Sequence, residues 1–238
     1  MTRTVLPELL DHLDPDDPSA QRSRRDLQRI HLVMRTLPTL RGAIRHLELP
    51  HRPRRVLELG AGDGTLLLRL ARTHASLWPD VELTFMDQHD LVSAQTRDAY
   101  GALGWRVSVL KRDVLDWARE AGPRDTDLCL TTLFLHHFKG QELTDILAAV
   151  AARSFAFVAC EPRRDPLSHL ASRLVGLIGG NRVTRSDAVS SVAAGFLGFE
   201  LGQQWPDPGS WRLEESHAFP FTHLFSARAS VPMTGGTV

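Results

Sequence analysis

The chain has 238 residues, of which 42% are hydrophobic, and this length suits one α/β domain with a small appendage better than two independent domains. Lysine plus arginine equals aspartate plus glutamate at 28 each, so the net charge does not indicate nucleic acid or an anionic membrane as an obligatory partner. A small-molecule partner is favoured instead, and no feature of the sequence indicates an oligomeric state.

The composition also bears on the compartment and on metals. The sequence has two cysteines, Cys129 and Cys160, and both lie inside apolar runs, which fits a reducing compartment. No Cys/His spacing resembles a zinc motif, so no metal is expected. A signal-peptide pattern is missing, and no apolar run approaches the roughly 18 residues of a membrane span. These features predict a soluble, cytoplasmic protein without a membrane partner.

Residues 1–53 are predicted to form an N-terminal helical cap. Ser19 can cap a first helix, and a second helix is expected over residues 39–47, before Pro50 and Pro53. Ten arginines lie between residues 21 and 55. We expect them on solvated helix faces, because charge runs on helices usually face water, and an anion or nucleic-acid site is the alternative.

Residues 54–238 are predicted to form the main domain, because strand-length apolar runs alternate there with helical patterns. Near the C-terminus, residues 211–216 and 221–230 read as a closing hairpin that places an antiparallel strand in the sheet. The expected fold is α/β, with a doubly wound, mostly parallel seven-stranded sheet. The other expected strands are residues 55–59, 82–87, 106–111, 128–132 and 155–160, and the helices between them are residues 66–76, 91–103, 115–121 and 142–152.

A glycine-rich turn follows the first strand. The sequence Glu58-Leu59-Gly60-Ala61-Gly62-Asp63-Gly64 places the glycines between a strand and a helix, where a ligand can touch the backbone. The spacing differs from the G-x-G-x-x-G that seats a pyrophosphate on a helix N-terminus. The Glu58 carboxylate would repel a pyrophosphate, whereas it suits a cation. S-adenosylmethionine, which carries a sulfonium, an ammonium and no phosphate, is therefore favoured as cofactor over a dinucleotide.

Acidic residues also follow the next two strands. Asp87, with Gln88 beside it, lies about twenty positions beyond the glycines, where a carboxylate can bind a ribose diol. Asp113 and Val114 offer a carboxylate and an apolar surface for an adenine amino group and ring. A helix cap is the alternative role for either aspartate.

These segments resemble the successive motifs of class I S-adenosylmethionine-dependent methyltransferases over residues 54–162. Within that class the pattern is similar to the ubiquinone/menaquinone-type small-molecule enzymes, whose fourth strand often ends in Leu-His-His, here Leu135-His136-His137. Residues 24–31, 181–188 and 194–196 resemble a bacterial subgroup found in biosynthetic settings for aromatic polyketides. The resemblance implies that Thr132 and Leu133 touch the methionine part of the cofactor.

The candidate catalytic residues lie at the carboxyl ends of the fourth and fifth strands. His136 and His137 can accept a phenolic proton near neutral pH, or they can pack beneath the glycine loop. Glu161 can orient the substrate or act as an alternative base, and its other possible role is an ion pair with a neighbouring arginine.

An insertion at about residues 163–206 is expected to form a substrate lid. Residues 167–178 are predicted to be a helix that stops at two glycines, followed by a polar loop. Arg164, Arg182 and Arg185 are candidate substrate residues, since an arginine can hold an acidic or phenolate oxygen. In the alternative interpretation, Arg185 pairs with Asp187 and Ser186 caps a helix.

The sequence therefore predicts an enzyme that transfers a methyl group from S-adenosylmethionine to a small aromatic or polyketide/quinone-like acceptor, on oxygen rather than carbon. An RNA-modifying methyltransferase is one alternative, and the zero net charge argues against it. An NAD(P)-dependent oxidoreductase is another, disfavoured by the glycine spacing. A non-catalytic binding protein is the third.

Overall fold

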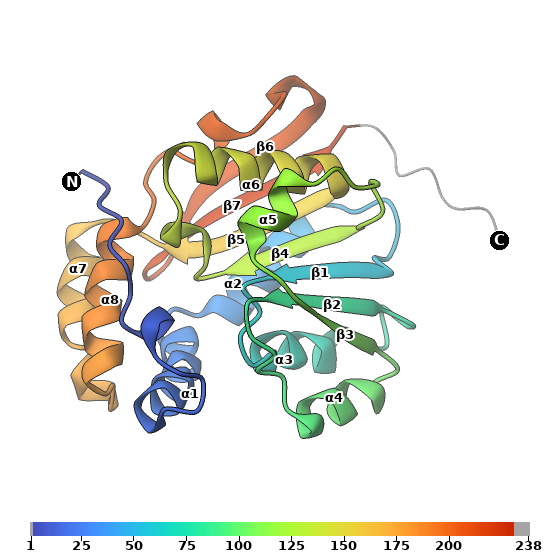
Figure 1. Cartoon of the computed structure of the whole chain (residues 1–238). Helices are drawn as coiled ribbons and strands as arrows, with labels where there is room; N and C mark the ends of the chain where they lie inside the picture. The colour runs from blue at the N-terminus through green and yellow to red at the C-terminus, as the bar shows by residue number, and fades with distance from the viewer. Residues whose placement is uncertain (1, 231–238) are drawn as a thin grey trace.

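The computed structural model describes residues 2–230, so the last eight residues of the predicted main domain lie outside it. The described residues form a seven-stranded sheet in the order β3-β2-β1-β4-β5-β7-β6 (Figure 1). Strands β1 to β5 pair in parallel, and β7 pairs antiparallel with both β5 and β6. The predicted doubly wound, mostly parallel sheet is confirmed.

The parallel strands lie at the apolar runs that predicted them in the sequence. The fifth strand differs slightly: it begins one residue later than predicted and continues to Pro162, because β7 pairs along its whole length as far as Thr222. The strands are β1 Arg55–Leu59, β2 Glu82–Asp87, β3 Arg106–Lys111, β4 Leu128–Thr132, β5 Ala156–Pro162, β6 Trp211–Ala218 and β7 Thr222–Ala229.

Successive side chains of a strand point to opposite faces, and this alternation explains why the sheet carries helices on both sides. On β1, Val56 belongs to a core formed with α2, α3 and α4, whereas Leu57 belongs to a core formed with α5 and α6. The helices are α2 Thr36–His46, α3 Thr65–His74, α4 Ala94–Gly101, α5 Val114–Arg119 and α6 Gly140–Arg153.

The remaining helices stand together beyond one end of the sheet, at the left of Figure 1. They are α1 Pro18–Val33, α7 Pro166–Arg173 and α8 Arg182–Ala194. Asp17 rather than Ser19 caps α1, and its carboxylate accepts from the Ser19 amide at 2.6 Å. Arg35 adopts a left-handed conformation (φ 55°), so the chain turns sharply between α1 and α2.

Residues 163–206, the predicted lid, contain one more helix than expected. The polar segment after the two glycines was expected to be a loop, but α8 occupies it. The Asn181 side chain caps this helix by accepting from the Thr184 amide at 2.8 Å. Ser186 is therefore not the cap, and Asp187 accepts from the amides of Leu9 and Leu10 instead of pairing with Arg185.

The N-terminal segment before α1 runs along α8 and over the end of the sheet (Figure 1). The Thr4 amide donates to the Ala193 carbonyl at 3.0 Å, and the Arg3 guanidinium donates to the His136 and Phe138 carbonyls. A 3-10 turn, η1 Leu10–His12, follows. This segment therefore joins α8 to the loop after β4.

Among the described helices, none is both long enough and apolar enough to cross a membrane.

Candidate active site

A cavity of about 470 Å³ lies between the carboxyl ends of the parallel strands and helices α1, α7 and α8. Ligands of open α/β sheets bind at this edge. The volume falls within the range of small-molecule sites. The sequence-predicted residues that line it are Glu58, Gly60, Ala61, Gly62, Asp87, Gln88, Val114, Thr132, Leu133, His136 and His137.

The turn after β1 brings backbone to one wall of this cavity. Gly60, Gly62 and Gly64 have φ angles of 66°, 54° and 68°, which side-chain-bearing residues rarely adopt. A Cβ at Gly60 would overlap the Phe134 ring, whereas nothing lies within 4 Å of the position of a Cβ at Gly62. The turn thus packs against protein at Gly60 and leaves room for a ligand at Gly62.

Glu58 is a buried carboxylate with an unsatisfied oxygen in this wall. Its side chain shares the face of β1 that carries Val56, and its Oε2 atom has no hydrogen-bond partner among the described residues. Burial, together with the charges of Asp63 and Asp87, holds the pKa of Glu58 well above its usual value. A buried polar atom without a partner requires an explanation. A bound cation would supply one.

Asp87 and Asp113 have different surroundings. Asp87 lines the cavity, and its Oδ2 accepts from the Gly62 amide at 3.0 Å, which connects the end of β2 to the glycine turn. Asp113 caps α5 by accepting from the Leu115 amide at 2.7 Å, and its other oxygen accepts from Gln88 at 2.7 Å. Asp113 is not among the described residues that line the cavity, so its assignment to the adenine amino group stays a prediction.

The loop after β4 is held in a tight turn by one buried carboxylate. Leu133 has a left-handed backbone (φ 52°), and the 3-10 turn η2 Leu135–His137 follows. The Glu161 carboxylate, fully buried at the end of β5, accepts from the amides of Phe134, Leu135 and His136. Glu161 therefore anchors this turn. Among the described residues it neither lines the cavity nor forms an ion pair with an arginine, which was the alternative role.

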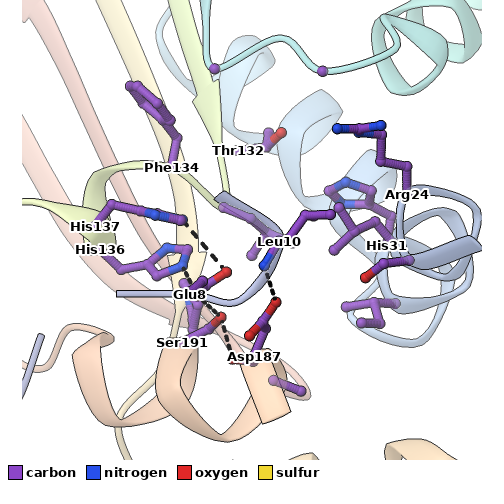
Figure 2. Close-up of a pocket in the computed structure, with 18 of the residues that line it drawn as sticks. Glu8, Leu10, Arg24, His31, Thr132, Phe134, His136, His137, Asp187 and Ser191 are labelled. Carbon is purple, nitrogen blue, oxygen red and sulfur yellow. Dashed lines mark hydrogen bonds and ion pairs between the residues drawn. The ribbon is translucent and has the colours of Figure 1, made fainter. Parts of the chain in front are cut away.

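Both histidines line the cavity, and Glu8 of the N-terminal segment lies against them (Figure 2). His136 Nδ1 is 2.8 Å from Glu161 Oε2, and His136 Nε2 is 3.2 Å from Glu8 Oε1. His137 Nδ1 is 3.1 Å from Asp11 Oδ2, and its Nε2 is 3.9 Å from Glu8 Oε2. The His136 side chain is 3% exposed and that of His137 is 22% exposed.

The charges of this cluster favour protonation of His136. Burial alone would lower the pKa of His136, but the hydrogen bonds and charges of Glu161 and Glu8 outweigh it and raise the pKa to about 9. Burial would likewise raise the pKa of Glu8, yet the hydrogen bonds and charges of the histidines, together with Ser191, lower it. A protonated His136 is a hydrogen-bond donor at neutral pH, not a base.

The half of the cavity away from the glycine turn is mainly apolar. Helix α1 and the lid supply most of its wall, including Leu27, Ile30, Val33, Ala171, Val175, Ile178, Ala188 and Val192. Arg24 and Arg112 are the arginines among the described lining residues. This half can accommodate an apolar acceptor.

The three arginines predicted to hold the substrate lie elsewhere. Arg164 is 4% exposed, bonds the Gly195 carbonyl and pairs with Glu200 at 2.6 Å. Arg182 and Arg185 border a separate outer depression beside Arg173. Within the described residues, none of the three predicted arginines lines the cavity.

Sequence analysis missed several polar residues of the cavity wall, among them Glu8, Asp11, His31 and Ser191. Glu8 and Asp11 lie in a segment without helical or strand periodicity, so no local pattern connects them to histidines 128 and 126 residues away. Burial lowers the pKa of His31 to about 4, which leaves its imidazole uncharged at neutral pH. His31 carried a weak signal, since it lies one turn beyond Leu27 on the apolar face of α1.

The central strands and helices of the chain match a known protein family. Residues 56–153 match the family model described as a methyltransferase domain. This part of the chain carries a methyltransferase domain. It includes the glycine turn, Asp87 and both histidines, so the predicted enzyme class and the cofactor S-adenosylmethionine are confirmed, and the free oxygen of Glu58 fits a cationic ligand.

Solved structures share the fold at low sequence identity. The plantazolicin methyltransferase BamL, crystallised with S-adenosylhomocysteine (SAH) and a desmethylplantazolicin analog, aligns with a TM-score of 0.65 and 14% identity over 91% of this chain and 93% of its own. An O-methyltransferase family protein from Burkholderia thailandensis aligns with a TM-score of 0.55 and 19% identity, over 90% of this chain and 61% of its own. Magnesium protoporphyrin IX methyltransferase from Synechocystis, with S-adenosylmethionine bound, aligns with a TM-score of 0.51 and 14% identity, over 93% of this chain and 88% of its own. No curated protein matches the sequence.

Proposed function

We propose that the protein methylates a hydroxyl group of a small, largely apolar acceptor, such as an aromatic or polyketide/quinone-like compound. The observation that carries this proposal is the continuity of one cavity, which has Glu58 and Asp87 on one wall and His137 on another. Methyl transfer requires the acceptor to lie in line with the methyl group, so donor and acceptor must share such a space.

The residues of the glycine turn would bind the donor. Glu58 would face its positive charge, backbone at Gly62 would contact it closely, and Asp87 would accept hydrogen bonds from the ribose hydroxyls. S-adenosylmethionine supplies a methyl group on a sulfonium centre, and the electron pair of the broken S–CH₃ bond stays on sulfur. Thr132 and Leu133, in the wall between donor and acceptor, would contact its methionine part.

His137 is the candidate base for the acceptor hydroxyl. Asp11 lies at its Nδ1, which orients the ring and leaves Nε2 directed at the cavity side of Glu8. His136 has Glu161 at one ring nitrogen and Glu8 at the other, so it would position the turn and Glu8 instead of taking the proton. The oxygen would lose its proton to His137 Nε2 as the new O–CH₃ bond forms.

Two features favour a small acceptor over an RNA chain. The acceptor half of the cavity is lined by aliphatic side chains of α1, α7 and α8, and the N-terminal segment passes over it. RNA recognition instead relies on aromatic stacking and basic surfaces. The plantazolicin and magnesium protoporphyrin enzymes, which share the fold, are named for small-molecule acceptors.

The test combines binding and turnover. Calorimetric titration should show binding of S-adenosylmethionine and not of NADPH. Incubation with a panel of phenols and hydroxyquinones and a ¹³C-methyl-labelled donor should then yield a methoxy carbon by NMR. Binding of NADPH alone would overturn the proposal, and a methyl group on carbon in every product would overturn the oxygen assignment.

A further inference from the structure

His136 and His137 each have a carboxylate next to the Nδ1 atom. A single catalytic base would need only one such pair. Each has a carboxylate at Nδ1: Glu161 at 2.8 Å from His136, and Asp11 at 3.1 Å from His137. When a carboxylate accepts the Nδ1 proton of a neutral imidazole, the lone pair lies on Nε2. Metal-binding histidines commonly have such a carboxylate behind them, which fixes the tautomer and the ring orientation.

Both Nε2 atoms face the same carboxylate. His136 Nε2 is 3.2 Å from Glu8 Oε1, and His137 Nε2 is 3.9 Å from Glu8 Oε2 (Figure 2). The candidate ligand atoms of these three residues all lie within 4.8 Å of one another. Ser191 donates a hydrogen bond to Glu8, so the carboxylate is held in place from the side of α8.

These separations fit one small ion. Ligands that bind at about 2.1 Å lie roughly 3.0–3.4 Å apart around a tetrahedral or octahedral centre. The His136 Nε2–Glu8 Oε1 distance of 3.2 Å lies within that range, whereas the His137 Nε2–Glu8 Oε2 distance of 3.9 Å exceeds it, so the His137 ring would move toward the ion on binding. In the ion-free protein a proton on His136 Nε2 can fill the gap to the Glu8 carboxylate, and a metal ion would displace that proton.

We propose that Glu8, His136 and His137 bind one divalent first-row transition-metal ion, with Glu161 and Asp11 as the carboxylates behind the histidines. Imidazole nitrogen combined with one carboxylate suits zinc, manganese, iron, cobalt or nickel better than magnesium or calcium. Three protein ligands leave coordination positions open toward the cavity. No zinc-motif spacing encodes this set, because Glu8 comes from a distant segment.

The role of the ion rests on the proposed function, whereas its binding does not. An acceptor oxygen bound to the ion would have a lower hydroxyl pKa, as a metal-bound water does. With both Nε2 atoms bound to the ion, the ion would take over the role given above to His137 in the ion-free site, and the hydroxyl proton would pass to solvent water. The ion would also fix the oxygen relative to the glycine turn.

The binding test uses the full chain without donor or acceptor. Chelator-treated protein is titrated calorimetrically with Zn²⁺, Mn²⁺ and Mg²⁺, and bound Mn²⁺ is followed by electron paramagnetic resonance. We expect one Zn²⁺ or Mn²⁺ per chain and no saturable Mg²⁺ binding. Absence of stoichiometric Zn²⁺ and Mn²⁺ binding would mean that a proton alone occupies the gap, and would overturn the proposal.

Substitutions test which residues bind the ion. Glu8→Gln and His137→Gln should weaken ion binding by more than 100-fold, and Asp11→Asn by about 10- to 100-fold. His217→Gln, an exposed histidine of β6, is the matched control and should bind as the wild type does. Circular dichroism checks that each variant is folded, and wild-type affinity in folded Glu8→Gln and His137→Gln would contradict the assignment.

Methyl transfer measured in the same samples separates the two proposals. Turnover that is unchanged after complete removal of the ion would overturn its catalytic role and leave the proposed function intact. Stoichiometric ion binding without methyl transfer to any hydroxyl acceptor would contradict the proposed function and leave the metal site intact.

Discussion

Glu161 Oε2 lies 2.8 Å from His136 Nδ1, and the same carboxylate accepts hydrogen bonds from the amides of Phe134, Leu135 and His136. One side chain at the end of β5 therefore sets the conformation of the turn after β4. The two adjacent parallel strands are connected at their ends by this carboxylate as well as by the sheet.

Replacement of Glu161 with glutamine should loosen that turn. Glutamine keeps one carbonyl acceptor and presents its NH₂ group to backbone amides, so at least one buried donor loses its partner. We expect the free energy of unfolding, measured with urea, to fall by about 2–4 kcal/mol. The exposed Glu142→Gln variant should leave it unchanged. An equal stability of both variants would contradict the anchoring role of Glu161.

Glu58→Gln should separate cofactor binding from stability. The buried Glu58 carboxylate has a raised pKa and an oxygen without a partner, so the neutral amide should not destabilise the ligand-free protein at pH 7. Glutamine cannot become the anion that would face the donor's positive charge, so S-adenosylmethionine binding should weaken about 10- to 100-fold, measured calorimetrically. Exposed Glu82→Gln is the control, and unaltered affinity in Glu58→Gln would remove the charge argument for this residue.

His137→Gln should affect turnover and leave donor binding alone. Removal of the proton acceptor, or of a metal ligand at the same position, should lower kcat by about 10²- to 10⁴-fold. The Kd for S-adenosylmethionine should be unchanged, because the glycine turn is intact. Formation of S-adenosylhomocysteine measures turnover, with His217→Gln as the control. Full activity in His137→Gln would exclude it as base.

A larger side chain on α8 should occupy the acceptor half of the cavity. Ala188 lines the cavity, whereas its neighbour Val189 borders the outer depression. Ala188→Phe should raise KM for the acceptor at least 10-fold by steric exclusion and keep donor affinity. Val189→Phe places the same ring one residue away and should leave both unchanged. Equal kinetics of the two variants would show that acceptors bind elsewhere.

His31 should make stability depend on pH in the acid range. Its pKa is lowered to about 4 in the folded protein, whereas an unfolded histidine has a pKa near 6.5. Between these values the unfolded chain binds more protons, so stability rises with pH from 4 to 6.5 and is constant above. The change should be about 2–3 kcal/mol in urea titrations. His31→Gln should flatten this part of the profile, and an identical profile would exclude His31 as its source.

The parallel sheet and the glycine turn were predictable because their signals are local. Apolar runs such as residues 128–132 are long enough to identify a buried strand, and three glycines between a strand and a helix identify a ligand-binding turn. Helix α8 was missed because Arg182 to Asp187 reads as polar, and its cap, Asn181, lies directly after two glycines. Its helical conformation depends on tertiary contacts, including the Ser23–Thr184 hydrogen bond to α1.

The polar end of the cavity was predicted in part. The histidines follow a recognisable strand, so their place at the sheet edge could be derived from the chain order. Glu8 and Asp11 could not, because they approach the histidines from more than 120 residues away and nothing in their neighbourhood marks them. The arginines of the lid were assigned by charge alone, and charge does not determine the direction in which a side chain points.

The N-terminal segment closes long loops within the described residues, since Thr4 pairs with Ala193 and Leu9 with Asp187. Contacts of such high sequence separation carry a large entropic cost of closure, so they form late in folding. The hydrogen bonds of residues 3–11 run to α8 and to the loop after β4, not to the strands, so local unfolding of the segment would leave the sheet intact. Because this segment carries Glu8 and Asp11, its detachment would open the cavity and dismantle the histidine cluster in one event, which would couple product release to resetting of the active site.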